Sequence, residues 1–100
     1  MNRPFVVRPE ARLDVLTARE WYEERETGLG SKFASQVADL FDRIAFNPEL
    51  YGKVWRTVRI GKTRRFPYLV CYRIRRNYVE VLAVIHSSRD DAVWKSRSKR

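Results

Sequence analysis

Residues 65–74 read RFPYLVCYRI, and this stretch decides the fold because its side chains alternate as they do along a β-strand. One set of alternating positions is aromatic or aliphatic: Phe66, Tyr68, Val70, Tyr72 and Ile74. The other set comprises Arg65, Leu69, Cys71 and Arg73. The pattern predicts one long strand over residues 65–74, with its first face turned toward a core.

Two further strands are predicted on either side of this one. Residues 54–60 alternate in the same way, and Gly61-Lys62-Thr63 is a turn signal between the two stretches. Arg75-Arg76-Asn77 predicts the next turn, and residues 79–85 are nearly all apolar. Such a run is typical of a central strand that is covered on both faces. The second half of the chain therefore predicts a mainly antiparallel sheet.

The first half predicts a short strand and two helices. Residues 3–8 form a strand candidate that Pro9 ends, and Pro9 also suits the first turn of a helix. Apolar residues then recur at helical spacing up to Gly28-Leu29-Gly30, which breaks the helix. Ser31 is placed to cap a second amphipathic helix, which Asn47-Pro48 ends. A tight turn between two such helices predicts an antiparallel helical hairpin.

Together these elements predict an α+β fold in the order β-α-α-β-β-β with a short C-terminal segment. The helical hairpin packs on one face of the sheet. A chain of 100 residues suits a single domain over residues 1–100. Within it, residues 94–100 are expected to form a basic, flexible tail.

The net charge of +9 is concentrated in the second half of the chain. Residues 1–50 hold seven Lys or Arg and nine Asp or Glu, a net −2, whereas residues 51–100 hold fourteen and three, a net +11. A positive field of this kind attracts polyanions and acidic proteins.

Other features restrict the compartment and the chemistry. Cys71 is the only cysteine, so no internal disulfide can form, which suits a reducing compartment such as the cytoplasm. We expect no signal peptide and no membrane span. One histidine and one cysteine cannot build a zinc site alone, so we expect no metal and no cofactor. Mid-strand Cys71 is expected to be buried and inert.

An ordered set of short motifs resembles one known family. The set is Trp21-Tyr22-Glu23, Gly28-Leu29-Gly30, Phe33, Asn47-Pro48-Glu49, Arg65-Phe66-Pro67-Tyr68 and Val81-Leu82-Ala83-Val84-Ile85-His86, followed by Arg89 and Trp94. Over about residues 6–97 the chain is similar to the ParE branch of the RelE/ParE toxin superfamily. The resemblance implies a type II toxin held inactive by a cognate antitoxin in a toxin–antitoxin hetero-oligomer. ParE-like members are taken to inhibit DNA gyrase by binding.

RelE-like members instead cut mRNA on the ribosome, and this alternative stays open. Cleavage needs cations to neutralise the phosphate and an acid–base pair to move protons. In the RelE pattern, an arginine follows the tyrosine of the third strand, where this chain has Leu69. Ser88 and Trp94 likewise stand where that pattern has a basic and a proton-transferring residue. The nuclease reading would use His86, Arg65 and Arg89, since histidine can serve as acid or base. A third alternative is a degenerate toxin that only binds an antitoxin or nucleic acid.

The sheet face opposite the helices is expected to be a basic, concave surface. Side chains on this face and near the C-terminus are the candidates for partner binding: Arg59, Arg65, Arg73, His86, Arg89 and Trp94. The partner would be the antitoxin together with gyrase, or the ribosome and mRNA in the nuclease alternative.

Overall fold

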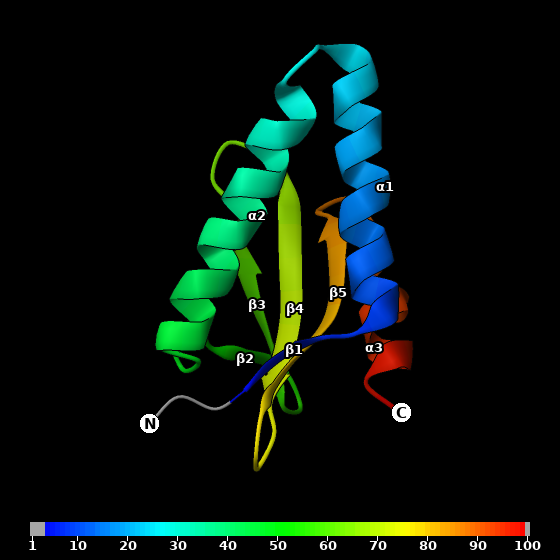
Figure 1. The fold of residues 1–100 in the computed structure, drawn as a ribbon. Helices are drawn as coiled ribbons and strands as arrows, with labels where there is room; N and C mark the ends of the chain where they lie inside the picture. Colours follow the sequence, from blue (N-terminus) through cyan, green and yellow to red (C-terminus); the bar gives the residue numbers. More distant parts are fainter. Residues whose placement is uncertain (1–3, 100) are drawn as a thin grey trace.

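The computed structural model describes residues 4–99 and has an α+β architecture (Figure 1). A five-stranded sheet carries a long helical hairpin on one face, and a short helix lies on the other side. The elements in chain order are β1 (Phe5–Val7), α1 (Pro9–Arg25), α2 (Leu29–Phe46), β2 (Lys53–Trp55), β3 (Val58–Lys62), β4 (Tyr68–Ile74), β5 (Val79–His86) and α3 (Ala92–Arg97).

The strands follow the order β1-β5-β4-β3-β2, and the sheet is mostly antiparallel. Only β1 runs parallel to its neighbour, β5. The predicted fold class is thus confirmed, but the predicted strand over residues 54–60 was wrong in detail. It is a hairpin of β2 and β3, because Arg56 adopts a left-handed backbone (φ 54°) that turns the chain.

The predicted strand over residues 65–74 also starts later, at Tyr68. Arg65 has a φ of 68°, which lies outside the β region, and Pro67 comes two residues later. Residues 63–67 therefore form the loop that enters β4. From Tyr68 onward the alternation predicted from the sequence holds.

The helical hairpin packs on the sheet through the predicted apolar stripes. The buried residues of α2 recur at helical spacing: Phe33, Val37, Leu40 and Ile44. Two glycines set the geometry of the turn between the helices. Gly28 has a φ of 91°, and a Cβ on Gly30 would lie 2.6 Å from the backbone oxygen of Arg19. The two helices can approach each other this closely only because Gly30 lacks a side chain.

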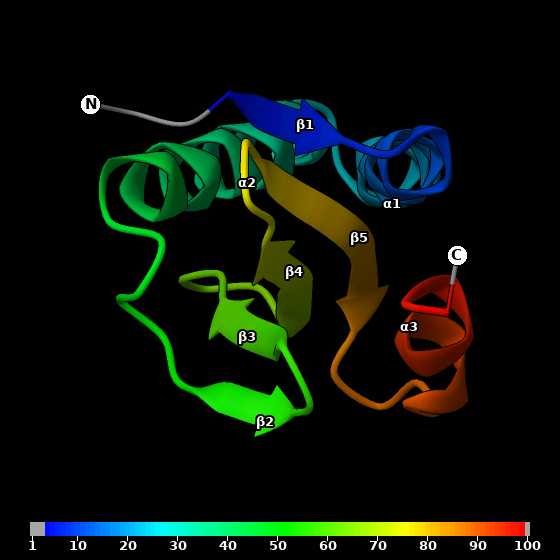
Figure 2. The ribbon, with the colours of Figure 1, turned by 90° about the horizontal axis from the view of Figure 1, so that it is seen from below.

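A second apolar cluster fills the opposite face of the sheet. Trp94 of α3, only 5% exposed, covers Val58, Cys71, Leu82, Ala83 and Ile85. Figure 2 shows α3 beside β5, on the side away from α2. This face was expected to be basic and open, and residues 94–100 were expected to be a flexible tail. Instead, burial of Trp94 holds Ala92–Arg97 as a helix over an apolar layer, and Arg100 lies outside the described residues.

Hydrogen bonds from two arginine side chains hold the end of α3 in place. The guanidinium of Arg8 donates to the carbonyl of Arg97 (2.7 Å), and that of Arg73 donates to the carbonyl of Ser98 (2.6 Å). Cations suit the carbonyl end of a helix. Arg73 is also paired with Glu80 at 2.7 Å.

Among the described residues 4–99, none of the helices has the length and apolar character that a membrane span requires.

Candidate functional site

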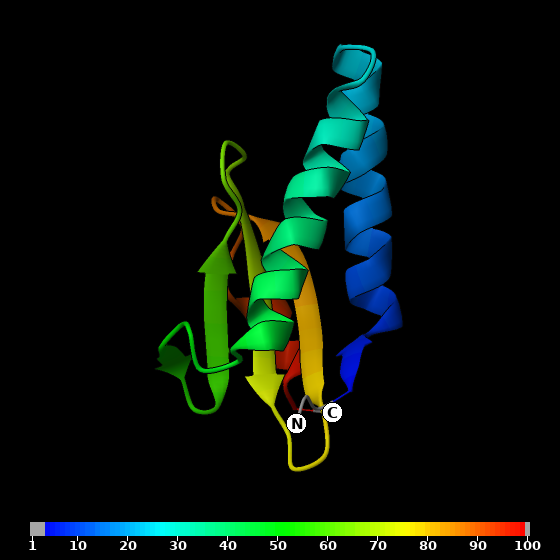
Figure 3. The same ribbon diagram turned by 60° about the vertical axis from the view of Figure 1, so that its left-hand side comes forward.

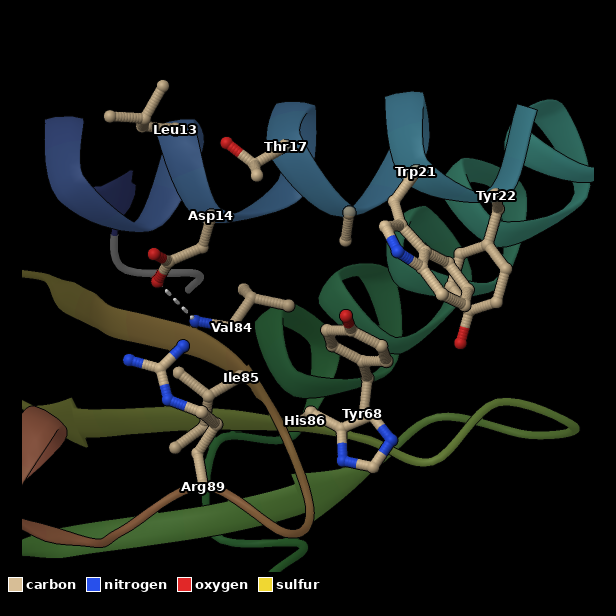
Figure 4. Close-up of a pocket in the computed structure, with 11 residues that line it drawn as sticks. Leu13, Asp14, Thr17, Trp21, Tyr22, Tyr68, Val84, Ile85, His86 and Arg89 are labelled. Atoms are coloured by element: carbon tan, nitrogen blue, oxygen red, sulfur yellow. Dashed lines mark hydrogen bonds between the residues drawn. The ribbon is translucent and has the colours of Figure 1, made fainter. Parts of the chain in front are cut away.

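The candidate site is a cavity of about 410 Å³ between α1 and the end of β5 (Figure 4). Residues from α1, β4 and β5 line it, and Arg89 closes it from the loop that follows β5. The side chains that line the cavity include Asp14, Thr17, Trp21, Tyr68, His86 and Arg89. The cavity thus combines an aromatic wall with one cation, one histidine and one carboxylate.

The cavity lies where one edge of β5 loses its strand partner. β1 pairs only with Val79–Val81, so the rest of that edge has no neighbouring strand. Relative to β4, β5 also carries one extra residue, Leu82, between the partners of Cys71 and Tyr72. A strand edge without a partner leaves backbone N–H and C=O groups to be satisfied in another way.

Two side chains supply those missing partners. The carboxylate of Asp14 accepts a hydrogen bond from the Val84 N–H (3.0 Å), drawn as a dashed line in Figure 4. Arg97 donates to the Leu82 carbonyl (3.0 Å) and to Asp14 (2.7 Å). An ion pair between α1 and α3 therefore takes the place of a neighbouring strand along this part of β5.

His86 is held by its neighbour Ser88. The backbone N–H of Ser88 donates to Nδ1 of His86 (3.0 Å), and the Ser88 hydroxyl lies 2.8 Å from the same nitrogen. Since Nδ1 accepts from an N–H, a neutral ring carries its proton on Nε2. The ring stands edge-on to Tyr68, with centroids 5.4 Å apart. Only Nε2 is then available for a contact with a partner.

Tyr68 and Arg89 determine the electrostatics of the cavity. Burial raises the pKa of the Tyr68 hydroxyl, the charge of Arg89 opposes that rise, and the Asp14 carboxylate adds to it. Burial, together with nearby Tyr68, also raises the pKa of Tyr22. Both phenols are therefore neutral at physiological pH, and they act there as hydrogen-bonding groups rather than as proton acceptors.

The structure brings together only part of the predicted set. His86 and Arg89 share the cavity, whereas Arg65 lines a different depression beside α2. Arg73 is buried against Glu80, and Trp94 is buried between α3 and the sheet. These two side chains lie inside the molecule, although an open face had been expected to carry them.

Arg59 has a local structural role as well. Its guanidinium donates to the Tyr51 carbonyl (2.6 Å), which holds the chain entering β2 against β3. This leaves Arg59 half-buried. The contact satisfies a backbone carbonyl of the segment between α2 and β2.

The sequence analysis missed the contribution of α1. Asp14, Thr17 and Trp21 follow at spacings of three and four, so they share one side of the helix. The same helical spacing in the sequence could have identified this polar and aromatic side of α1. Leu13 (64% exposed) and Trp21 (48% exposed) border the cavity, so α1 presents apolar surface to solvent next to it.

Comparisons with known proteins agree with this architecture. A model of the family described as "ParE toxin of type II toxin-antitoxin system, parDE" matches residues 5–91. Eleven solved chains also match significantly. One of them, described as "Chromosomal ParDE TA system from P. aeruginosa", has a TM-score of 0.64 and 14% identity, covering 84% of this chain and 95% of that one. No curated protein matches significantly.

Proposed function

Because the chain belongs to the ParE toxin family of type II toxin–antitoxin systems, we propose that it inhibits DNA gyrase by binding and that a cognate ParD antitoxin neutralises it. We place this action in the cytoplasm. The family match covers most of the chain and ends just before α3.

The observation that carries the proposal is the dispersal of the residues that cleavage would need. His86 and Arg89 meet at the β5 cavity, but Arg65 borders another depression. Trp94, at the position of a proton-transferring residue in the RelE pattern, is 5% exposed and packs against Trp55 with ring centroids 5.9 Å apart. Its indole N–H can donate but cannot relay a proton. This arrangement supports binding rather than hydrolysis.

Inhibition by binding requires only that the toxin prefer one state of its target. A ligand with higher affinity for the cleaved gyrase–DNA state shifts the population toward that state. The net +11 of residues 51–100 would speed the encounter with an acidic or DNA-loaded partner. Arg89, exposed at the mouth of the cavity, is our candidate for the central contact.

For the antitoxin we propose the outer side of α1. Leu13, Leu16 and Trp21 are each about half exposed or more, and two of them border the cavity. Large exposed apolar side chains gathered on one helix beside a cavity suit a protein-binding region. An antitoxin segment seated there would cover the cavity and Arg89 together, which would account for neutralisation by occlusion.

A ribosome-dependent ribonuclease is the second candidate, and one observation favours it. The His86 ring stands beside the Tyr68 ring, in the same cavity as Arg89. A histidine and an arginine at one site are the minimum for acid–base and phosphate chemistry. This candidate predicts that His86→Ala removes toxicity, whereas the binding proposal predicts that toxicity persists. A degenerate toxin would leave cell growth unaffected.

A supercoiling reaction with purified gyrase and plasmid tests the proposal. We expect the toxin to cause linear, cleaved plasmid to accumulate, and addition of the antitoxin to prevent it. His86→Ala should act as the wild type does. If gyrase is unaffected by a toxin that still arrests growth, and if His86→Ala abolishes that arrest, the ribonuclease candidate replaces this one.

A further inference from the structure

We propose that the loop between β3 and β4, with the facing side of α2, forms a phosphate-binding cleft for the backbone of double-stranded DNA. The basic tip comprises residues 62–67, which are Lys62 at the end of β3 and the loop that follows it. It lies apart from the β5 cavity and projects beyond the sheet beside α2 (Figure 3). The inference goes beyond gyrase inhibition, because it concerns contact with DNA itself.

The basic tip carries cations that have no internal counter-ion. Lys62, Arg64 and Arg65 are exposed, and Lys32 faces the tip from α2 across an open depression of about 580 Å³. Within residues 4–99, none of these four side chains forms an ion pair. The described linings of this depression and of its neighbour at the tip contain no acidic residue. An anion would therefore meet uncompensated positive charge.

The backbone of the tip is held in a strained conformation. Arg65 has a φ of 68°, in the left-handed region that residues with a Cβ rarely adopt. The hydroxyl of buried Thr63 donates to the Phe66 carbonyl (2.9 Å) and to the Tyr68 carbonyl (3.2 Å). The Phe66 ring packs on Phe33, with centroids 5.4 Å apart. The cations are thus presented on a rigid loop, which lowers the entropy lost when they bind.

The opposite wall of the cleft offers neutral polar groups. Ser31 and Ser35 line it with their hydroxyls, and Gln36 adds an amide. The Oε1 atom of Gln36 is buried and has no hydrogen-bond partner in residues 4–99. Hydroxyl, amide and cationic donors together suit the oxygens of a phosphate.

The surroundings of the cleft favour DNA over an acidic protein. A protein segment would bring apolar side chains along with its carboxylates, and these need exposed apolar surface. The large exposed apolar residues lie elsewhere, on β1, on α1, at the end of α2, before β2 and within it, and the apolar part of the cleft lining is limited to the partly buried Leu29 and the buried Phe66. The DNA backbone instead repeats one charge about every 3.4 Å along each strand and needs only cations and donors.

Fluorescence anisotropy with a short labelled DNA duplex, without gyrase, tests the proposal. The tip variant is Lys62→Ala/Arg64→Ala/Arg65→Ala. The charge-matched control is Arg12→Ala/Lys53→Ala/Arg75→Ala, at three exposed positions that do not line the cleft. We expect the tip variant to lose at least about tenfold in affinity and about three from the slope of log K against log salt. The control should stay within about twofold of the wild type.

A charge-retaining variant shows whether any loss comes from misfolding. Arg64→Lys/Arg65→Lys keeps the charges and should bind within about threefold of the wild type, because phosphate contacts need mainly a point charge. Equal losses in the tip variant and the control would overturn the proposal in favour of a diffuse positive field. A tip variant with unchanged DNA affinity but weakened antitoxin binding would assign the cleft to a protein. The DNA-binding assay contains no gyrase. A finding that the toxin does not inhibit gyrase would therefore leave the DNA-binding result unchanged.

Discussion

Asp14 on α1 and Arg97 on α3 form a two-contact ion pair, with N–O distances of 2.7 and 3.3 Å, although 83 positions separate them in the sequence. The same two side chains bond to the N–H of Val84 and the carbonyl of Leu82. One pair therefore fixes the C-terminal helix and satisfies the unpaired edge of β5, and its Asp14 member lines the candidate site.

Replacing Asp14 should destabilise the protein. Asp14→Asn keeps an oxygen for the Val84 N–H but removes the charge opposite Arg97, so we expect a loss of about 1–3 kcal/mol in urea unfolding. Asp14→Ala removes both contacts and should cost more. Asp42→Asn on α2, where the carboxylate is exposed, is the control and should stay within about 0.5 kcal/mol. Equal stability of Asp14→Asn and the wild type would show that the ion pair contributes nothing.

The helices and strands were predictable because local periodicity specifies them. Phe33, Val37, Leu40 and Ile44 repeat at the spacing of a buried helical face, and the alternation after Tyr68 holds along β4. The sequence also indicated a core on the helical side of the sheet. These features depend on neighbours a few residues apart, and a single sequence displays such spacing directly.

The errors arose where distant contacts decide the structure. Helix α3 has only six residues and would not be stable alone; it persists because Trp94 is buried on β5 and Arg97 binds Asp14. Similarly, the left-handed backbone of Arg56 and Arg65 leaves no mark in a pattern of polar and apolar residues. The site was half predicted: the chain after β5 identified His86 and Arg89, but nothing local paired them with α1.

Trp94 should control access to Cys71. The thiol is fully buried in the cluster that Trp94 covers, and burial raises its pKa to about 12. Its thiolate, the reactive form, is therefore scarce at pH 8. We expect native wild-type protein to resist a thiol reagent at pH 8 and Trp94→Ala to react at least about tenfold faster, while losing about 3–5 kcal/mol of stability. Trp21→Ala, which removes an exposed tryptophan side chain from α1, is the control and should leave the thiol protected. Fast labelling of the wild type would contradict the assigned burial.

The raised pKa of Cys71 also predicts how stability depends on pH. The unfolded thiol ionises near its ordinary value of 9.0, whereas the folded thiol stays protonated up to about pH 12. The unfolded state therefore binds fewer protons in this range, and stability falls as pH rises from about 9 to 12. The slope reaches at most about 1.4 kcal/mol per pH unit for this group.

Cys71→Ala removes that contribution and leaves the tyrosines unchanged. We therefore expect the stability gap between wild type and variant, measured by urea unfolding, to narrow by about 1 kcal/mol between pH 8 and pH 10. Burial also raises the pKa of Tyr68 and Tyr72, so both proteins should lose stability at high pH. A gap that is constant between the two pH values would mean that the folded thiol ionises as freely as the unfolded one.

Substitutions of Arg89 and of His86 should differ sharply in their effect on the proposed inhibition of gyrase. Arg89 is exposed at the mouth of the cavity, and it forms no ion pair within residues 4–99. Arg89→Glu reverses a charge at the proposed contact without removing an internal bond, so we expect at least a tenfold weaker inhibition with unchanged stability. Arg12→Glu on α1 makes the same change in net charge and should weaken inhibition less than threefold. Because inhibition by binding needs no proton transfer, His86→Ala should also stay within about threefold. If Arg89→Glu and Arg12→Glu weaken inhibition equally, Arg89 contributes only to the overall positive field of the protein. If His86→Ala alone loses inhibition, proton transfer by His86 becomes part of the mechanism.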